Sequence, residues 1–278
     1  MIGMECLGDD PRELFEELAE HTQDRVLRAA LVAEGPRVER RAREYLSLAE
    51  VGDLSAFDRE EPVGVTSGQL SGVYDRVLVG GYGRPIYDRI KASAKFKRCP
   101  LCGLRVVKTL DHYLPQTRFP ELAVFPANLV PACADCNKSK LAHVAESRAE
   151  ETFHPYFDDW SEYCVLGASL EFGESLTVSY RVLTAPAMSA VDVQRARNHF
   201  DLLELNELYV SYAASELAES KRTFRNNFAS GPEALREELR QVAGTRSEGN
   251  LNGWMAVLYR CLAESDDFCN GGFELIEE

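Results

Sequence analysis

The hydrophobic and polar residues of this chain follow a helical period at both ends and lose it in the centre. Apolar positions recur about every 3.6 residues in three N-terminal stretches, which predicts helices over residues 10–34 and 36–50 and one or two helices over 69–94, interrupted by Gly80, Gly81 and Gly83. Asp10 and Pro11 form a typical helix start, because aspartate accepts the first free N–H groups and proline fits the first helical position. Between the second and third helices, residues 51–68 are rich in acids, glycine and proline and predict a loop.

The second half predicts a hairpin followed by helices. Residues 177–184 alternate between apolar and polar, which is typical of a strand, and 164–172 is the natural partner strand. The helical period then returns over residues 191–203, 207–224, 232–244 and 252–265. The result is an α+β fold that is mainly helical.

The centre differs from both halves. Residues 96–145 contain a short β-like run, 104–110, which is followed by four prolines, Pro115, Pro120, Pro126 and Pro131. We therefore expect three regions: an N-terminal helical region (1–83), a compact core (84–160), and a hairpin with C-terminal helices (161–278).

Composition excludes several classes of protein. The 278 residues are 45% hydrophobic and 27% charged, as in an ordinary globular chain. No apolar run approaches the ~20 residues that span a bilayer. The first residues have neither a basic segment nor an apolar one, so no secretory signal is expected. The expectation is a soluble, cytoplasmic protein with no membrane contact.

Charge is distributed unevenly. The formal net charge is −14, which by itself disfavours binding to phosphates. However, residues 84–108 contain eight cationic side chains and one acid. This basic segment makes phosphate contacts plausible locally, and the nucleic-acid-binding candidates are Arg89, Lys91, Lys95, Lys97, Arg98, Lys138 and Lys140.

Four of the eight cysteines form two C-x-x-C pairs, Cys99/Cys102 and Cys133/Cys136. In a chain without a secretory signal, such pairs indicate a metal site before a disulfide. Four thiolates form a closed tetrahedral Zn²⁺ site, which is structural because it has no position open to substrate.

The residues between and after these cysteines resemble a known family. Asp111-His112-x-x-Pro115, then Asn128-Leu129, then Cys133-x-x-Cys136-Asn137-x-x-Lys140 resembles the zinc-stapled branch of the HNH endonucleases. A weaker likeness continues through residues 154–158, whose sequence HPYFD resembles HNH subunits of bacterial anti-phage systems.

The resemblance implies a ββα-metal core that cuts DNA with one divalent ion. His112 is the expected general base, since a neutral imidazole accepts a proton near pH 7. Asp111 and Asn137 are the expected ligands of a catalytic Mg²⁺ or Mn²⁺, because hard oxygen donors suit these ions. Asn128 is expected to brace the hairpin and orient the base. His154 is a further active-site candidate, or else a packed turn residue.

The family likeness also implies a role as the nuclease of an anti-phage system, with an ATPase subunit as partner and with oligomerisation open. RNA remains an alternative substrate, since the motif addresses phosphates and reads no bases. The alternative from another class is a non-catalytic zinc adaptor that docks a partner protein.

Overall fold

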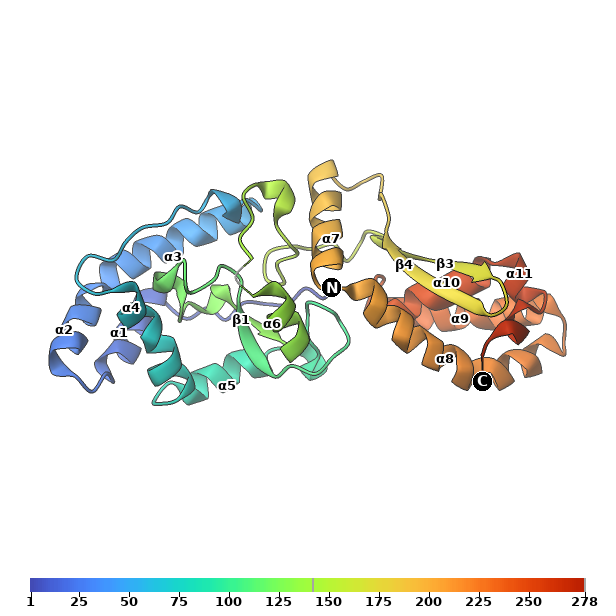
Figure 1. The fold of residues 1–278 in the computed structure, drawn as a ribbon, viewed down its shortest axis with the longest axis horizontal. Helices are drawn as coiled ribbons and strands as arrows, with labels where there is room; N and C mark the ends of the chain where they lie inside the picture. Colours follow the sequence, from blue (N-terminus) through green and yellow to red (C-terminus); the bar gives the residue numbers. More distant parts are fainter. Residues whose placement is uncertain (142, 278) are drawn as a thin grey trace. The chain divides into compact units, whose positions relative to one another are not determined.

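The chain forms two compact units, Met1–Asp159 and Trp160–Glu278. The structure is a computed structural model that describes residues 1–141 and 143–277 (Figure 1). These residues are mainly helical and contain two antiparallel two-stranded sheets, which confirms the predicted α+β, mainly helical class. Within the same residues, no helix is both long enough and apolar enough to cross a membrane.

The first unit carries six α-helices in its described residues: α1 (Pro11–Glu20), α2 (Arg25–Ala33), α3 (Gly35–Glu50), α4 (Ser67–Val73), α5 (Arg84–Ala92) and α6 (Ala134–Lys140). The expected helix over 36–50 is confirmed as α3. The expected single helix over 10–34 is wrong, because it breaks into α1 and α2. Asp24 causes the break, since its carboxylate accepts from the N–H groups of Val26 and Leu27, at 2.8 and 2.9 Å, and starts a new helix.

The N-terminal helices and the central hairpin share one hydrophobic core. Its buried members come from α1 to α5, from the helical segment Tyr74–Val79 that follows α4, from both strands of the hairpin and from the loop between the strands. They include Phe15, Leu31, Val38, Leu78, Ile90, Leu110 and Leu129. The hairpin strands are only four residues long, and such a hairpin is marginal by itself. Packing against the helices therefore contributes much of the stability of this hairpin.

This hairpin consists of β1 (Thr109–His112) and β2 (Leu129–Ala132). The strands are antiparallel, with His112 opposite Leu129 at one end and Thr109 opposite Ala132 at the other. The strand predicted over 104–110 is wrong in its bounds, because Val106 forms only an isolated bridge with Arg98 and regular pairing starts at Thr109.

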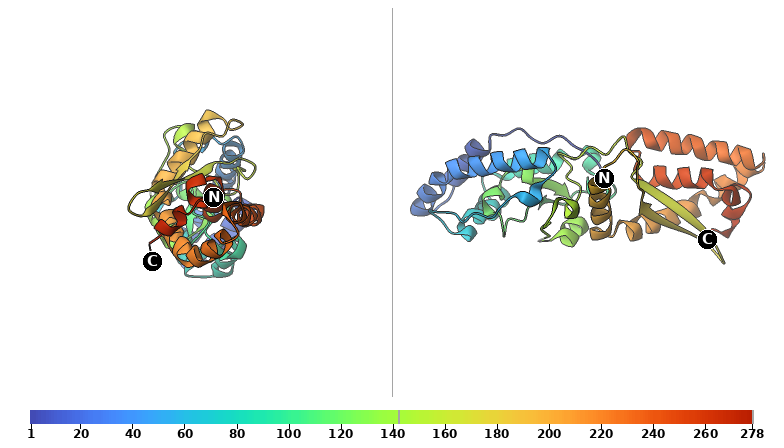
Figure 2. Two further views of the ribbon diagram at one scale, coloured as in Figure 1. Left: turned by 90° about the vertical axis from the view of Figure 1, so that its right-hand side faces the viewer. Right: turned by 90° about the horizontal axis from the view of Figure 1, so that it is seen from above.

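The second unit contains the other hairpin, β3 (Leu166–Phe172) and β4 (Leu176–Val182), paired in the predicted antiparallel sense. The helices that follow are α7 (Ala190–Leu202), α8 (Leu205–Phe228), α9 (Pro232–Gly249), α10 (Trp254–Glu264) and α11 (Asp266–Cys269). Helix α10 packs on β3 and on α9, while α8 packs on β4, so the hairpin lies against a helical layer (Figure 2).

Candidate active site and metal centre

The β1–β2 hairpin is followed directly by helix α6, which packs against β1. The segment joining the strands is fixed by Asn128, whose side chain is fully buried. Its Oδ1 accepts from the N–H of Leu114 at 2.7 Å, and its Nδ2 donates to the carbonyls of Leu114 and Leu122 at 3.0 and 3.3 Å. One amide thus ties the chain leaving β1 to the loop that returns to β2.

The four paired cysteines come together at the base of this hairpin. All four are buried, and their Sγ atoms lie within 4.8 Å of one another. Cys133 and Cys136 stand at the start of α6, while Cys99 and Cys102 enclose a tight turn that ends at Gly103, whose φ of +69° suits glycine. In tetrahedral Zn–thiolate sites the sulfur atoms are roughly 3.8 Å apart, as follows from a Zn–S bond of about 2.3 Å. This donor set fits one zinc ion.

His112 ends strand β1 and is oriented by the loop of Asn128. Its Nε2 lies 2.8 Å from the carbonyl oxygen of Ala123, and its ring packs edge-on against Tyr74, with 4.5 Å between the ring centres. A carbonyl only accepts, so Nε2 carries the proton and Nδ1 of the neutral ring is the basic nitrogen. Burial of the ring lowers the pKa of His112 to about 4, so the imidazole is neutral at pH 7.

Asp111 is buried on the other face of the hairpin and pairs with Lys140. Its Oδ2 lies 3.0 Å from Lys140 Nζ, and both side chains are about 95% buried. The ammonium also donates to the carbonyls of His112 and Tyr113, at 2.8 and 2.7 Å. Burial raises the pKa of Asp111, and the adjacent ammonium opposes that rise.

Asn137 lies on α6, half-buried, three positions before Lys140. Residues three apart on a helix are neighbours on one face. Because Lys140 reaches Asp111 from this face, Asn137 belongs to the same side of α6. Asp111 carries a carboxylate and Asn137 an amide oxygen, which are donor types that suit Mg²⁺ or Mn²⁺. In this structure the positive charge beside the Asp111 carboxylate is the ammonium group of Lys140.

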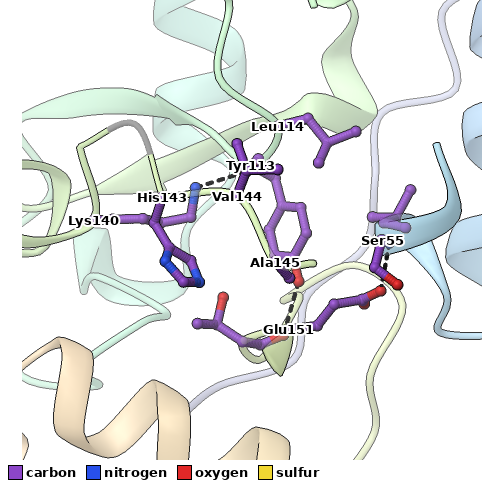
Figure 3. A pocket seen from close by; sticks show the side chains of 10 residues that line it. Ser55, Tyr113, Leu114, Lys140, His143, Val144, Ala145 and Glu151 are labelled. Carbon is purple, nitrogen blue, oxygen red and sulfur yellow. Dashed lines mark hydrogen bonds between the residues drawn. The ribbon is translucent and has the colours of Figure 1, made fainter. Parts of the chain in front are cut away.

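Lys140 also borders a small cavity (Figure 3). The cavity holds about 20 Å³, enough for a single water molecule, and its lining includes Tyr113, His143 and Glu151. Glu151 is buried and accepts from the N–H of Ser55 at 2.7 Å. The space behind Lys140 is therefore a water-sized void and does not accommodate an organic ligand.

The predicted nucleic-acid contacts have different surroundings. Lys95, Lys97 and Lys138 are exposed. Arg89 pairs with Asp9 at 2.6 Å, Lys91 lies 3.5 Å from Asp88, and the Arg98 guanidinium donates to the Leu104 carbonyl at 2.6 Å. The prediction for Lys140 as a surface contact requires correction, because the carbonyls at the end of β1 and the Asp111 carboxylate draw this side chain inside.

His154 is a core residue in this structure, and this corrects its candidacy for the active site. Its ring is 2% exposed. Nε2 lies 2.8 Å from the hydroxyl of Tyr45, Nδ1 lies 3.3 Å from the N–H of Tyr156, and the ring packs edge-on against Phe157. Because the Tyr156 N–H donates to Nδ1, the ring proton is on Nε2. Both ring nitrogens are therefore engaged in hydrogen bonds within the core.

Two contributors to the site were not predicted from sequence. The Ala123 carbonyl, which selects the tautomer of His112, is a backbone atom and has no sequence signal. Tyr74, which packs on the imidazole, lies in a π-helical segment (Tyr74–Val79) that continues α4. A π-helical turn inside a helix often marks a functional site, but the sequence shows only a helical period there.

The chain is similar to two curated proteins. Protein ea31 of Escherichia phage lambda is 29% identical over 289 residues, which covers 93% of this chain and 96% of the phage protein. Septu protein PtuB of Bacillus thuringiensis is 28% identical over 101 residues, covering 32% of this chain and 38% of PtuB. No protein-family profile matches the chain, and no solved structure matches it.

Proposed function

We propose that this chain is a metal-dependent endonuclease of the HNH type that hydrolyses DNA phosphodiester bonds. The observation that carries the proposal is His112, which burial keeps neutral and the Ala123 carbonyl holds in one tautomer, at the end of a strand that also bears Asp111. The order strand, strand, helix over residues 109–140, with cysteines before and after the hairpin, matches the arrangement that the HNH likeness implies.

In the proposed reaction, Nδ1 of His112 takes the proton of the attacking water. Asn128 acts through the backbone, because it fixes the loop whose carbonyl orients the imidazole. A zinc ion held by the four cysteines would stabilise the turn before β1 and the start of α6, and so would hold the two sides of the site together.

Asp111 and Asn137 would hold the catalytic Mg²⁺ or Mn²⁺. Such an ion supplies positive charge to the phosphate and to the departing oxygen. Lys140 competes with it for the Asp111 carboxylate, since both are cations that seek the same oxygen. We therefore expect Lys140 to move off Asp111 when the site is loaded.

We also propose a role in anti-phage defence, on the basis of the similarity to the Septu protein PtuB. The acidic charge outside residues 84–108 disfavours tight binding to free DNA, so a partner that supplies targeting, such as an ATPase subunit, belongs to this proposal. The relative that matches nearly the whole chain is a phage protein, and its name states no activity.

The test is cleavage of supercoiled plasmid by the purified chain with Mg²⁺, Mn²⁺ or EDTA, beside His112→Ala. We expect nicking or linearisation that needs the metal and falls at least about 100-fold in the variant. If the chain cuts RNA and not DNA, the proposed substrate is wrong and the enzyme is an RNA nuclease. If neither nucleic acid is cut, with or without a co-purified partner, while zinc is present, the chain is the zinc adaptor instead.

A further inference from the structure

An exposed aromatic side chain stands at the centre of the basic segment. Phe96 is 84% exposed, although it lies between buried Ala94 and the buried metal ligand Cys99. Most phenylalanine side chains of a folded chain are buried, because exposing one forgoes about 1.5–3 kcal/mol of hydrophobic free energy. Phe96 thus needs an explanation that scattered surface valines do not.

The backbone holds Phe96 outward in an unusual conformation. Phe96 and Lys97 both have positive φ, 54° and 56°, which is the left-handed region. For residues other than glycine this region costs roughly 1–2 kcal/mol each. Two such residues in succession persist only where the surroundings fix them, and backbone outliers of this kind concentrate at functional sites.

The surroundings of this turn do fix it. The N–H of Lys97 donates to the Ala94 carbonyl, and the Lys97 carbonyl accepts from Val107, both at 2.9 Å. Two residues on, the N–H of Cys99 donates to the Arg105 carbonyl at 2.8 Å. The turn is therefore attached to the segment entering β1 and to the four-cysteine cluster, and Phe96 is presented on a rigid support.

The charges around Phe96 are available to an anion. Lys95 and Lys97 flank it and are exposed, and neither pairs with an acidic side chain in residues 1–141 or 143–277. Lys95 Nζ lies 5.5 Å from the centre of the Phe96 ring. Arg89 and Lys91, nearer the N-terminus, are already paired with aspartates. Among the exposed cations of this segment that have no acidic partner, Lys95 and Lys97 thus stand directly beside the exposed ring.

A recess lies next to the same turn. It encloses about 340 Å³, at the lower end of the range for ligand pockets. Lys95 and Arg98 line it together with the N-terminal segment, which contributes mostly apolar residues, such as Ile2 and Met4, and one acid, Glu5. An aromatic face, two unpaired cations and a partly apolar recess together suit a ligand that has both a flat ring and a phosphate.

We propose that Phe96, Lys95 and Lys97 bind an unpaired nucleotide of the DNA substrate, with the base stacked on Phe96 and the phosphates facing the lysines. The inference rests on the proposed nuclease function and adds a substrate class to it. A base in an intact duplex has both faces covered by its neighbours, so only a single strand, flap or kinked step offers a face to the ring. The site therefore favours DNA with unpaired bases.

The position of the Phe96 turn also limits the distance between the stacked base and the bond that is cut near His112. Val107, bonded to Lys97, lies five residues before His112 along an extended segment, which is at most about 17 Å. A stacked strand rises about 3.4 Å per nucleotide along the helix axis, so this length corresponds to about five stacked nucleotides, and to fewer in an extended single strand. Cleavage is expected at a fixed short distance from a junction between paired and unpaired DNA.

The first test measures binding of the full chain to labelled single-stranded and duplex oligonucleotides in buffer without divalent ions, so that no cutting occurs. Phe96→Ala should weaken single-strand binding by about 5- to 150-fold, the range for loss of one stacked base, and weaken duplex binding much less. The matched control is Val106→Ala, another exposed apolar residue (54% exposed) bridged to the same turn, which should bind as the parent does.

The second test detects the stacking itself. In Phe96→Trp, single-stranded DNA should quench the added tryptophan fluorescence and affinity should be retained, whereas Val106→Trp should show no added quenching. The inference is overturned if Phe96→Ala binds as the parent does, or if the two tryptophan variants are quenched alike. If that occurs while His112-dependent plasmid cutting persists, only this inference fails. If the parent neither binds nor cuts DNA, the proposed function fails as well.

Discussion

Asn128 in the first unit and Asn252 in the second are buried side chains with the same task. Each uses its amide to bond backbone groups at the end of a two-stranded hairpin. Asn252 accepts from the N–H groups of Val165 and Leu166, at 2.8 and 3.2 Å, and donates to carbonyls including that of Tyr163 at 2.8 Å. Asn128 bonds Leu114 and Leu122 in the same manner.

The two asparagines differ in the residues that surround them. The loop held by Asn128 presents a carbonyl to His112, and its hairpin carries Asp111 and adjoins the four cysteines. In residues 160–277 no comparable group of His, Cys, Asp and Glu comes close enough to hold a metal. A buried asparagine at a hairpin end thus has a structural role, and the proposed chemistry belongs to the side chains around Asn128.

The two hairpins also stay folded for different reasons. Strands β3 and β4 have seven residues each, pair over their full length and pack on helices. Strands β1 and β2 have four each and depend on the helical core, the cysteine cluster and the buried Asp111–Lys140 pair. Loss of a cysteine of the cluster or of the Asp111–Lys140 pair should therefore destabilise the first unit and leave the second unit folded.

The largest expected effect is loss of the metal ligands. Cys133→Ser should lose the bound zinc and unfold the β1–β2 hairpin with α6, because structural zinc sites contribute up to about 10–16 kcal/mol of binding free energy. The second unit should keep its protection in hydrogen exchange. Elemental analysis and exchange measurements report both, with exposed Cys164→Ser as the matched control. Equal protection of β1 in a zinc-free variant would refute the structural role of the metal.

The next effect is that of Lys140, compared with its exposed neighbour Lys138. Lys140→Met leaves the Asp111 carboxylate buried without its partner, which should lower the free energy of unfolding by about 3–5 kcal/mol. Lys138→Met should change it by less than about 0.5 kcal/mol. Urea unfolding measures both. The double variant Asp111→Asn with Lys140→Met should recover part of the loss, and no recovery would show that the pair is not coupled.

A smaller effect is expected when the two buried asparagines, Asn128 and Asn252, are each replaced. Asn128→Ala and Asn252→Ala each leave buried backbone groups unpaired, at about 1–3 kcal/mol per group, so both should lower the unfolding free energy by similar amounts. Only Asn128→Ala should also slow plasmid cutting at a temperature where both variants are folded. A loss of cutting by Asn252→Ala equal to that by Asn128→Ala would remove the functional distinction between the units.

Periodic and spacing signals account for what the sequence could predict. Helix α3 and the β3–β4 hairpin follow from their apolar patterns, because each buries one face. The cysteine cluster could be predicted from the two C-x-x-C pairs, because this spacing is typical of cysteines that bind one metal ion together. The break between α1 and α2 does not follow, because the apolar period runs through it and only the Asp24 cap interrupts the helix.

Other features depend on contacts between distant residues. A lysine near other cations predicts an exposed side chain, but the carbonyls of His112 and Tyr113 and the Asp111 carboxylate draw Lys140 inward. The burial of His154 likewise depends on Tyr45, 109 positions earlier. The tautomer of His112 depends on a backbone carbonyl. Such features need the three-dimensional fold, because no local pattern encodes them.

The measurement that tests the central claim most directly is plasmid cutting by His112→Ala and Asn252→Ala beside the parent chain, with Mn²⁺ or Mg²⁺ and at a temperature where all three are folded. We expect His112→Ala to lose at least about 100-fold in rate while it keeps its zinc and its hairpin, and Asn252→Ala to cut at nearly the parent rate. Cutting by His112→Ala at the parent rate would contradict the assignment of the chemistry to the β1–β2 hairpin.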